Sequence, residues 1–246
     1  MKICDAIELL SIQTWNTLAT CHAQGIAINE DVVTTNNLVF LSNNVPGTFV
    51  AFDTRPWEYF VGCDFEMWIG SNQTGWCGYA IQAKRVQVIT GKYTQLAHTN
   101  ALGRQIDLLD NYAAWSGTQP LYLFYNTLSP YIGSLCSSAY PPGMIGCTIT
   151  PSHVVDTALS TYGAKNFGWI HARPETALWR CLTCCQPHPG NTCFAAPSGA
   201  HPLKQLPARV QQVMRSGLPP TEEFDRYERT LRPKAIVVID TSADVS

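Results

Sequence analysis

Apolar residues recur at helical intervals near the start of the chain, with polar residues between them. The recurring positions are Ile7, Leu10, Ile12, Trp15 and Leu18. This spacing predicts an amphipathic helix over residues 5–19 that packs on the core. A second helix is expected to begin near Asn29, whose side chain can cap it, and to end around Asn36 and Asn37. Glu30 then lies in the first turn, where the helix dipole favours a carboxylate.

Segments rich in aromatic and β-branched residues follow, and we expect each to form a strand. They cover residues 48–53, 57–69 and 78–88. Helical spacing returns over residues 93–115, and the short apolar run at residues 121–125 suits a buried strand. A crossover helix followed by a further strand is typical of an α/β core.

The composition shifts after residue 129 towards Pro, Gly, Ser and Cys. Within this part, a helix is expected from Ser152 to about Tyr162, and residues 234–240 are expected to add a strand at the edge of the sheet. The pattern predicts an α/β fold with a mixed central sheet flanked by helices. We therefore divide the chain into a core, residues 1–130, and a Cys- and Pro-rich C-terminal elaboration, residues 131–246, packed on that core.

Two successive strands carry polar residues at alternating positions. Side chains two residues apart share one face of a strand, so Asp64 and Glu66 point the same way. Gln82 and Lys84 share one face of the next strand for the same reason. Residues 70–75 are dense in turn formers, so an antiparallel hairpin with a long loop is expected to join the strands. A carboxylate, a carboxamide and an ammonium group can then converge on one point.

Those groups suit the metal-dependent hydrolysis of a phosphodiester. A divalent ion polarises the phosphate and lowers the pKa of the attacking water, and Mg²⁺ prefers oxygen ligands. Asp64 and the side-chain oxygen of Gln82 could supply such ligands. The ammonium of Lys84 could stabilise the developing charge, or orient or deprotonate the water. The expected cofactor is therefore Mg²⁺ or Mn²⁺.

The stretch from Cys63 to Arg85 resembles the PD-(D/E)xK, or restriction endonuclease-like, nuclease superfamily. The match is to members with Gln in place of the middle acid, such as restriction enzymes of the Mrr type. Together with residues 105–109 and 120–126, it also looks like an uncharacterised bacterial family described as restriction-endonuclease-like. The resemblance covers roughly residues 25–130, about half of the chain. Cys63 stands where the motif has Pro, and Gln82 is neutral where an acid is commoner.

The resemblance implies a restriction endonuclease-like core and a metal-dependent endonuclease. Glu30 matches an acid on the helix that precedes the Asp strand, so it is implied as a metal ligand beside Asp64 and Gln82. Glu66, Gln105 and Arg85 are implied accessory residues. The implied substrate is nucleic acid, DNA more than RNA, and the implied role is bacterial anti-phage defence. A homo-oligomer or a defence-system partner protein would fit that role.

Composition favours a globular enzyme or binding domain with a sizeable core, since 46% of the 246 residues are hydrophobic and 14% are charged. The net charge is −2, but residues 1–80 hold 2 basic and 8 acidic residues, whereas residues 81–246 hold 14 and 10. Basic residues follow the motif and could contact a phosphate backbone. They are Lys84, Arg85, Lys92 and Arg104.

No apolar run reaches the roughly 20 residues that span a bilayer. Asp5 and Glu8 also lie where a secretory signal would have a basic start and an apolar middle. We therefore expect a cytoplasmic protein without a membrane partner. The chain has neither a phosphate-cradling Gly-rich loop nor a Gly-x-Ser-x-Gly elbow, which argues against nucleotide-driven and α/β-hydrolase chemistry.

The ten cysteines make up only about 4% of the chain, fewer than a disulfide scaffold needs. Those scattered singly are expected to be buried thiols, namely Cys4, Cys21, Cys63, Cys77, Cys136 and Cys147. The others crowd one segment, in which Cys181, Cys184, His188 and Cys193 could hold a structural Zn²⁺. The spacing misses that of a zinc knuckle by one residue, so packed or surface thiols stay the alternative.

Two other functions stay open. A catalytically inactive module with the same fold could bind nucleic acid or protein if the incomplete acidic set fails to hold a metal. A thiol enzyme would use Cys136 or Cys184 as its nucleophile, with His153, His171 or His188 as the base. No local sequence signature supports the thiol enzyme.

Overall fold

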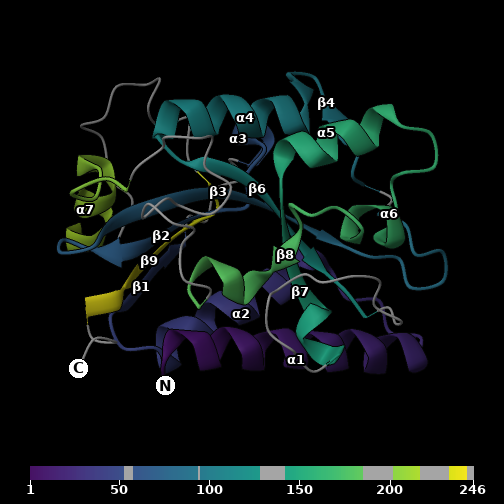
Figure 1. Cartoon of the computed structure of the whole chain (residues 1–246), viewed down its shortest axis with the longest axis horizontal. Helices are drawn as coiled ribbons and strands as arrows, with labels where there is room; N and C mark the ends of the chain where they lie inside the picture. Colours follow the sequence, from purple (N-terminus) through teal and green to yellow (C-terminus); the bar gives the residue numbers. More distant parts are fainter. Residues whose placement is uncertain (53–57, 94, 128–141, 185–201, 217–232, 243–246) are drawn as a thin grey trace. The chain divides into compact units, whose positions relative to one another are not determined.

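The structure of the protein is a computed structural model that describes residues 1–52, 58–93, 95–127, 142–184, 202–216 and 233–242 (Figure 1). The chain forms two compact units. One comprises residues 1–41, 83–98 and 121–186, and the other comprises residues 42–82, 99–120 and 187–246. Both units draw on segments far apart in the sequence, so neither follows the boundary expected near residue 130. We call them the first and the second unit.

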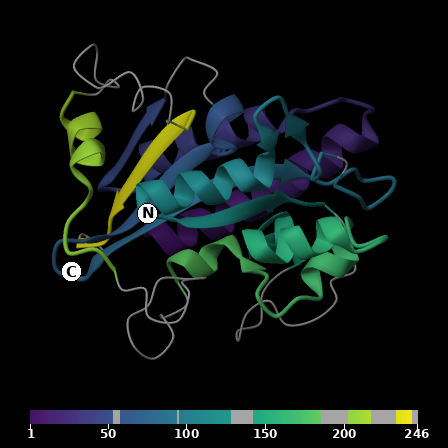
Figure 2. The same ribbon diagram turned by 90° about the horizontal axis from the view of Figure 1, so that it is seen from above.

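The second unit holds one part of a mixed β-sheet. Its strands lie in the order β1 (Thr48–Phe52), β9 (Ala235–Asp240), β2 (Phe65–Ser71) and β3 (Gly75–Arg85). Strand β9 is antiparallel to β1 and parallel to β2, whereas β2 and β3 are antiparallel. Seen from above in Figure 2, the yellow β9 lies beside β1. The strand expected at residues 234–240 is confirmed, but it lies between two strands and not at the edge.

Short helices and a hairpin complete the second unit. They are α3 (Glu58–Val61), β4 (Thr99–Asn100), β5 (Gly103–Arg104), α4 (Gln105–Ser116) and α7 (Ala208–Ser216). Val210 and Val213 bury one side of α7 in a cluster that also contains Trp68, Trp76 and Val238. Because α7 is short, the burial of these side chains, and not helix propensity, holds it in place.

The first unit contains the end of β3, followed across the sheet by β6 (Gln119–Tyr125), β7 (Cys147–Pro151) and β8 (Ala177–Leu178). Its helical segments are α1 (Ile3–Ala23), α2 (Glu30–Asn44), η1 (Pro142–Gly146), α5 (Ser152–Ser160), α6 (Phe167–His171) and η2 (Trp179–Leu182). Over the described residues the sheet has seven strands, which confirms the α/β class and the mixed sheet. None of the described helices is long and apolar enough to cross a bilayer.

Helix α2 continues past its expected end at Asn36 and Asn37. Asn37 is buried, and its side-chain Nδ2 donates to Thr14 Oγ1 of α1 at 3.3 Å. Leu38 and Leu41 extend the buried face beyond it. The buried amide of Asn37 is therefore satisfied by a neighbouring helix, which sequence alone could not show.

Two other expected elements are shorter than the sequence suggested. The strand expected at residues 57–69 is confirmed only from Phe65 onward, because α3 precedes it. The helix expected at residues 93–115 begins only at Gln105, after the β4–β5 hairpin. Gly103 in that hairpin has a φ of 136°, a conformation that suits a turn and not a helix.

The β2–β3 hairpin is confirmed, with Phe65 opposite Ile81 and Ser71 opposite Gly75. Its loop is shorter than expected because pairing continues to Ser71. Trp68 lies opposite Gly78, and a Cβ added to Gly78 would lie 2.5 Å from the Trp68 ring. Glycine is therefore required there, because the indole packs directly over the backbone of β3.

A buried histidine lies in the first unit. His171 Nδ1 lies 2.9 Å from the carbonyl oxygen of Phe167, so Nδ1 carries the proton and donates it. Nε2 then accepts from Thr148 Oγ1 at 2.8 Å. Burial lowers the pKa of His171 to about 4. The imidazole is thus a neutral packing group, and the described structure gives it no thiol to activate.

The fold should lose stability in mild acid through His171. The unfolded chain binds a proton near the ordinary pKa of about 6.5, whereas the folded chain does so only near about 4. The free energy of unfolding therefore falls between these two pH values, by at most about 3 kcal/mol. Urea unfolding at a series of pH values measures it. The slope should disappear in His171→Gln and persist in His153→Gln, which replaces an exposed histidine; an unchanged slope in His171→Gln would refute this assignment.

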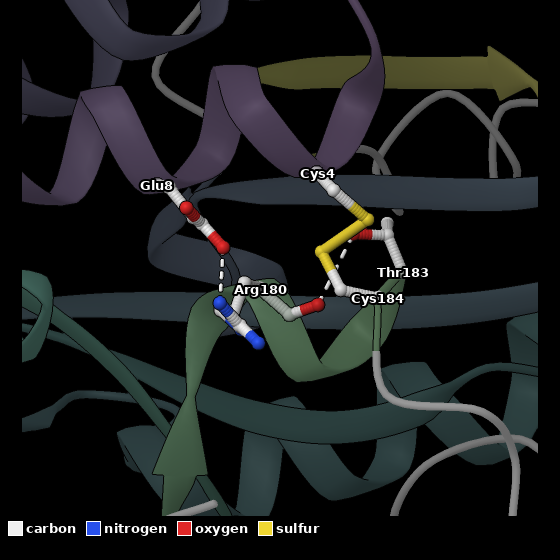
Figure 3. The surroundings of a disulfide bond; sticks show 5 residues. All are labelled: Cys4, Glu8, Arg180, Thr183 and Cys184. Atoms are coloured by element: carbon white, nitrogen blue, oxygen red, sulfur yellow. Dashed lines mark hydrogen bonds and ion pairs between the residues drawn. A yellow bond between two sulfur atoms is a disulfide. The ribbon is translucent and has the colours of Figure 1, made fainter. Parts of the chain in front are cut away.

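A disulfide joins Cys4 of α1 to Cys184, which follows η2, with their Cα atoms 5.4 Å apart (Figure 3). Beside it, Arg180 donates a hydrogen bond to the carboxylate of Glu8. Cys77 is disulfide-bonded as well. The expectation of buried thiols is therefore wrong for Cys4 and Cys77. It is confirmed for Cys63 and Cys147, which are buried and not disulfide-bonded, whereas the thiol of Cys21 is only partly buried.

Loss of this disulfide should destabilise the fold. The bond joins residues 180 positions apart and restricts the unfolded chain, so Cys4→Ser is expected to lower the free energy of unfolding by about 2–4 kcal/mol. Urea unfolding with and without reductant measures the effect. Cys21→Ser, which removes a free thiol, is the matched control. Equal stability of the wild type in both redox states would show that the bond does not form in solution.

Candidate functional site

Asp64 lies directly before β2, where main-chain hydrogen bonds fix it on both sides. Its N–H donates to the carbonyl of Ile81 on β3 at 2.9 Å. Its carbonyl accepts from the N–H of Ala235, the first residue of β9, at 3.3 Å. The carboxylate therefore starts from a backbone position that two neighbouring strands determine.

The side chains of Asp64, Gln82 and Gln105 form a hydrogen-bonded chain within the second unit. Gln82 Nε2 donates to Asp64 Oδ2 at 2.5 Å, and Gln105 Nε2 donates to Gln82 Oε1 at 3.1 Å. All three residues are buried. The predicted convergence of Asp64 and Gln82 is therefore confirmed, and Gln105 joins them from the start of α4.

Gly62 allows α4 to come this close. Its φ is +62°, in the left-handed region, and a Cβ there would lie 2.3 Å from the carbonyl oxygen of Gln105. Any larger residue would push the start of α4 away from the segment that leads into Asp64. Glycine at this position therefore keeps the Gln105 amide within reach of Gln82.

A lysine that sequence analysis did not single out also meets Asp64. Lys234 Nζ lies 3.5 Å from Asp64 Oδ1. Lys234 directly precedes Ala235, whose backbone bonds to Asp64, so the pairing of β9 with β2 brings the lysine here. Sequence carries no signal for this contact, because the two residues belong to distant segments.

In the first unit, Lys84 and Glu30 form an ion pair, with Lys84 Nζ 3.6 Å from Glu30 Oε1. The backbone N–H of Arg85 donates to Glu30 Oε2 at 3.3 Å. Helix α2 is tied to β6 by a 2.8 Å hydrogen bond between Thr34 Oγ1 and the Tyr125 hydroxyl. The helical acid and the end of β3 therefore meet as expected, but both carboxylate oxygens of Glu30 have partners from β3. Its role as a metal ligand stays a prediction.

Glu66 has a different role from the accessory catalytic one expected. Its carboxylate is fully buried and accepts from Trp68 Nε1 and from the Tyr112 hydroxyl. Arg209 of α7 pairs with it, Nη1 lying 2.9 Å from each carboxylate oxygen. Burial opposes the charge on Arg209, but the Glu66 carboxylate holds the pKa of that guanidinium above its ordinary value. Glu66 therefore anchors α7 and has no oxygen left for a metal.

The zinc set does not assemble as expected. The sulfur of Cys184 is bonded to Cys4, so it cannot act as a thiolate ligand or as a nucleophile in this state. Cys181 is buried and is not disulfide-bonded. His188 and Cys193 lie outside the described residues, as does Cys136. Among the described residues, no three His, Cys, Asp or Glu side chains are grouped as a metal site would need.

Asp64 and Gln82 nevertheless fit a hard divalent cation. The nitrogen and oxygen of a carboxamide are interchangeable by a half-turn, which would put Gln82 Oε1 where Nε2 now lies, 2.5 Å from Asp64 Oδ2. Two neighbouring ligands at about 2.1 Å from Mg²⁺ lie about 3 Å apart. Mg²⁺ sites also commonly use one or two carboxylates, with water and phosphate oxygens completing the shell. After the half-turn, the Asp64 and Gln82 oxygens therefore need to move apart only slightly to bind one Mg²⁺ together.

The fold and this site define an α/β protein with a carboxylate and carboxamide pair beside the central strands of its sheet. A family described as a family of unknown function (DUF6615) matches residues 3–244. Because the match covers nearly the whole chain, the protein belongs to this family. The comparisons with curated proteins and with solved structures find no match.

Proposed function

We propose that the protein is a metal-dependent nuclease in which Asp64 and Gln82 hold the divalent cation. The observation that carries the proposal is the direct contact between the Asp64 side chain, just before β2, and the Gln82 side chain on β3. A carboxylate and a carboxamide brought together by paired strands offer the oxygen ligands that Mg²⁺ and Mn²⁺ prefer. This arrangement agrees with the Gln variant of the PD-(D/E)xK pattern.

Lys84 supplies the ammonium group that would act on the phosphate or the attacking water. On any extended strand, side chains two residues apart share one face, with their Cα atoms about 6.7 Å apart. Lys84 follows Gln82 on β3 by this interval, and its ion pair with Glu30 holds the ammonium in a defined position. When bound, the metal would polarise the phosphate and lower the pKa of the attacking water. Lys84 would stabilise the charge that develops on the phosphate, or orient the water.

Gln105 is a positioning residue for Gln82. It donates to Gln82 Oε1 while Gln82 donates to Asp64. If Gln82 turns its oxygen towards a cation, its nitrogen faces Gln105, which can turn its own oxygen to accept. The two amides can therefore change direction together and keep the hydrogen bond between them.

DNA, more than RNA, is the proposed substrate, and anti-phage defence in the bacterial cytoplasm is the proposed role, both from the superfamily resemblance. In the cytoplasm, the disulfide between Cys4 and Cys184 would be exposed to reduction. Cytosolic thiols are mostly kept reduced, whereas disulfides persist in oxidising compartments. Activity is therefore to be assayed in both redox states.

A second candidate is a binding module without catalysis, and specific contacts favour it. Both acids predicted as metal ligands already have a lysine partner: Asp64 has Lys234 at 3.5 Å, and Glu30 has Lys84 at 3.6 Å. Asp64 is 3% exposed and Gln82 is 0% exposed. A site of this kind could serve structure alone, with another surface holding nucleic acid or protein.

Cleavage assays separate the two candidates. The purified chain is incubated with plasmid, linear duplex, single-stranded DNA and RNA, in Mg²⁺, Mn²⁺ or chelator, with and without reductant. The nuclease is supported if cleavage requires a metal and is lost in Asp64→Asn, a variant of nearly the same shape. Binding of a nucleic acid without cleavage under every condition would favour the module.

A further inference from the structure

Lys234 and Gln82 contact different carboxylate oxygens of Asp64. Gln82 binds Asp64 Oδ2, and the Lys234 ammonium lies 3.5 Å from Oδ1. A divalent cation held by Asp64 and Gln82 would carry its charge next to this ammonium. Two cations around one carboxylate repel each other, and burial strengthens the repulsion because the protein interior screens charge poorly.

The two partners differ in their freedom to move. The side chain of Asp64 is 4% exposed, whereas that of Lys234 is 30% exposed. Backbone hydrogen bonds from Asp64 to Ile81 and from Ala235 to Asp64 fix the carboxylate between strands. Lysine has a long flexible stem whose ammonium can move out to water. Lys234 is therefore the partner that can leave when a second cation arrives.

Without a metal, the buried carboxylate needs a compensating charge, because an isolated ion in the interior is costly. Lys234 supplies that charge. We propose that Lys234 is a built-in competitor for the divalent cation, which stabilises the metal-free protein and must be displaced before Asp64 and Gln82 can hold a metal. This inference rests on the proposed metal site and adds its regulation: the lysine lowers cation affinity and so sets the concentration at which the site fills.

The test measures the binding of Mn²⁺ alone, by titration calorimetry and by the electron paramagnetic resonance signal of free Mn²⁺. Lys234→Met removes the charge and keeps most of the side chain's volume. It is expected to bind Mn²⁺ at least about tenfold more tightly than the wild type. Lys234→Arg, which keeps a cation, should stay close to the wild type. Lys204→Met is the matched control, because it removes the same charge from an exposed position of the same unit.

Thermal unfolding provides a second readout. Lys234→Met should melt below the wild type without metal, and Mn²⁺ should raise its melting temperature by more than it raises that of the wild type. If the methionine variant does not fold, Lys234→Gln removes the charge while keeping a polar group. Unchanged or weaker Mn²⁺ binding in the folded charge-removing variant overturns the inference.

The outcomes distinguish this inference from the proposed function. Metal-dependent cleavage by the wild type, with equal Mn²⁺ affinity in Lys234→Met, overturns the competitor role and leaves the nuclease intact. If Lys234→Met loses cleavage but keeps the wild-type Mn²⁺ affinity, Lys234 acts at the phosphate, and the competitor role is again overturned. If neither wild type nor variant binds Mn²⁺, both proposals fail.

Discussion

Replacing Lys84 with Met is expected to slow metal-dependent DNA cleavage by about 10²- to 10³-fold while leaving Mn²⁺ binding nearly unchanged. The ammonium is assigned to the phosphate or the water, not to the metal. Its removal therefore raises the barrier of the chemical step without removing an oxygen ligand. Asp64→Asn should behave differently, because it removes a ligand charge and should lose both Mn²⁺ binding and cleavage.

Controls for Lys84→Met must separate chemistry from folding, since Lys84 also pairs with Glu30 in the first unit. Melting curves report the folding effect. Lys92→Met removes the same charge from an exposed position of that unit and should change cleavage by less than about tenfold. Cleavage by Lys84→Met at the wild-type rate would remove the lysine from the mechanism.

Removing Glu66 is expected to be among the most destabilising single changes in the second unit. Glu66→Ala should lower the free energy of unfolding by about 3–5 kcal/mol, because it leaves the partly buried Arg209 guanidinium without its carboxylate. Tyr112 and Trp68 would also lose the acceptor to which they donate. Since Arg209 lies on α7, the loss should loosen that helix first.

A double-mutant cycle tests this directly by urea unfolding. Arg209→Met should also be strongly destabilising, because it leaves the Glu66 carboxylate alone. The double variant Glu66→Leu with Arg209→Met should lose much less than the sum of the single changes, because no unpaired charge is left. Losses below about 1 kcal/mol in both single variants would show that the ion pair contributes little.

Local patterns predicted the parts of the fold that depend on neighbouring residues. Alternation and the turn formers at residues 70–75 predicted the β2–β3 hairpin and the shared strand faces that bring Gln82 to Asp64. The register and the short loop were not predicted, because a long loop was expected. Helix α1 followed in the same way from its apolar spacing, and α5 from the residues that open it, Thr150, Pro151 and Ser152.

Contacts between distant segments could not be predicted. Strand β9 was recognised as a strand, but nothing in its sequence shows that it enters between β1 and β2, parallel to the latter. Both Lys234 at Asp64 and Arg209 at Glu66 come from the last fifth of the chain. For this reason Glu66 was mistaken for an accessory catalytic acid, whereas its role depends on a guanidinium 143 residues away.

The cysteines show the same limit. Spacing within residues 181–193 suggested a local metal site, whereas Cys184 is bonded to Cys4, 180 residues away in the sequence. Disulfide partners are set by the folded distance between Cα atoms, which spacing along the chain does not contain.

Mn²⁺ binding to the wild type and to Asp64→Asn, followed by titration calorimetry on metal-free protein, tests most directly whether Asp64 and Gln82 hold a divalent cation. We expect one Mn²⁺ per chain in the wild type, a clear loss of affinity in Asp64→Asn, and a smaller loss in Gln82→Ala, since carboxylates bind hard cations more strongly than amides. Equal Mn²⁺ binding by all three proteins, or no binding by the wild type, would contradict the metal site and the nuclease function proposed from it.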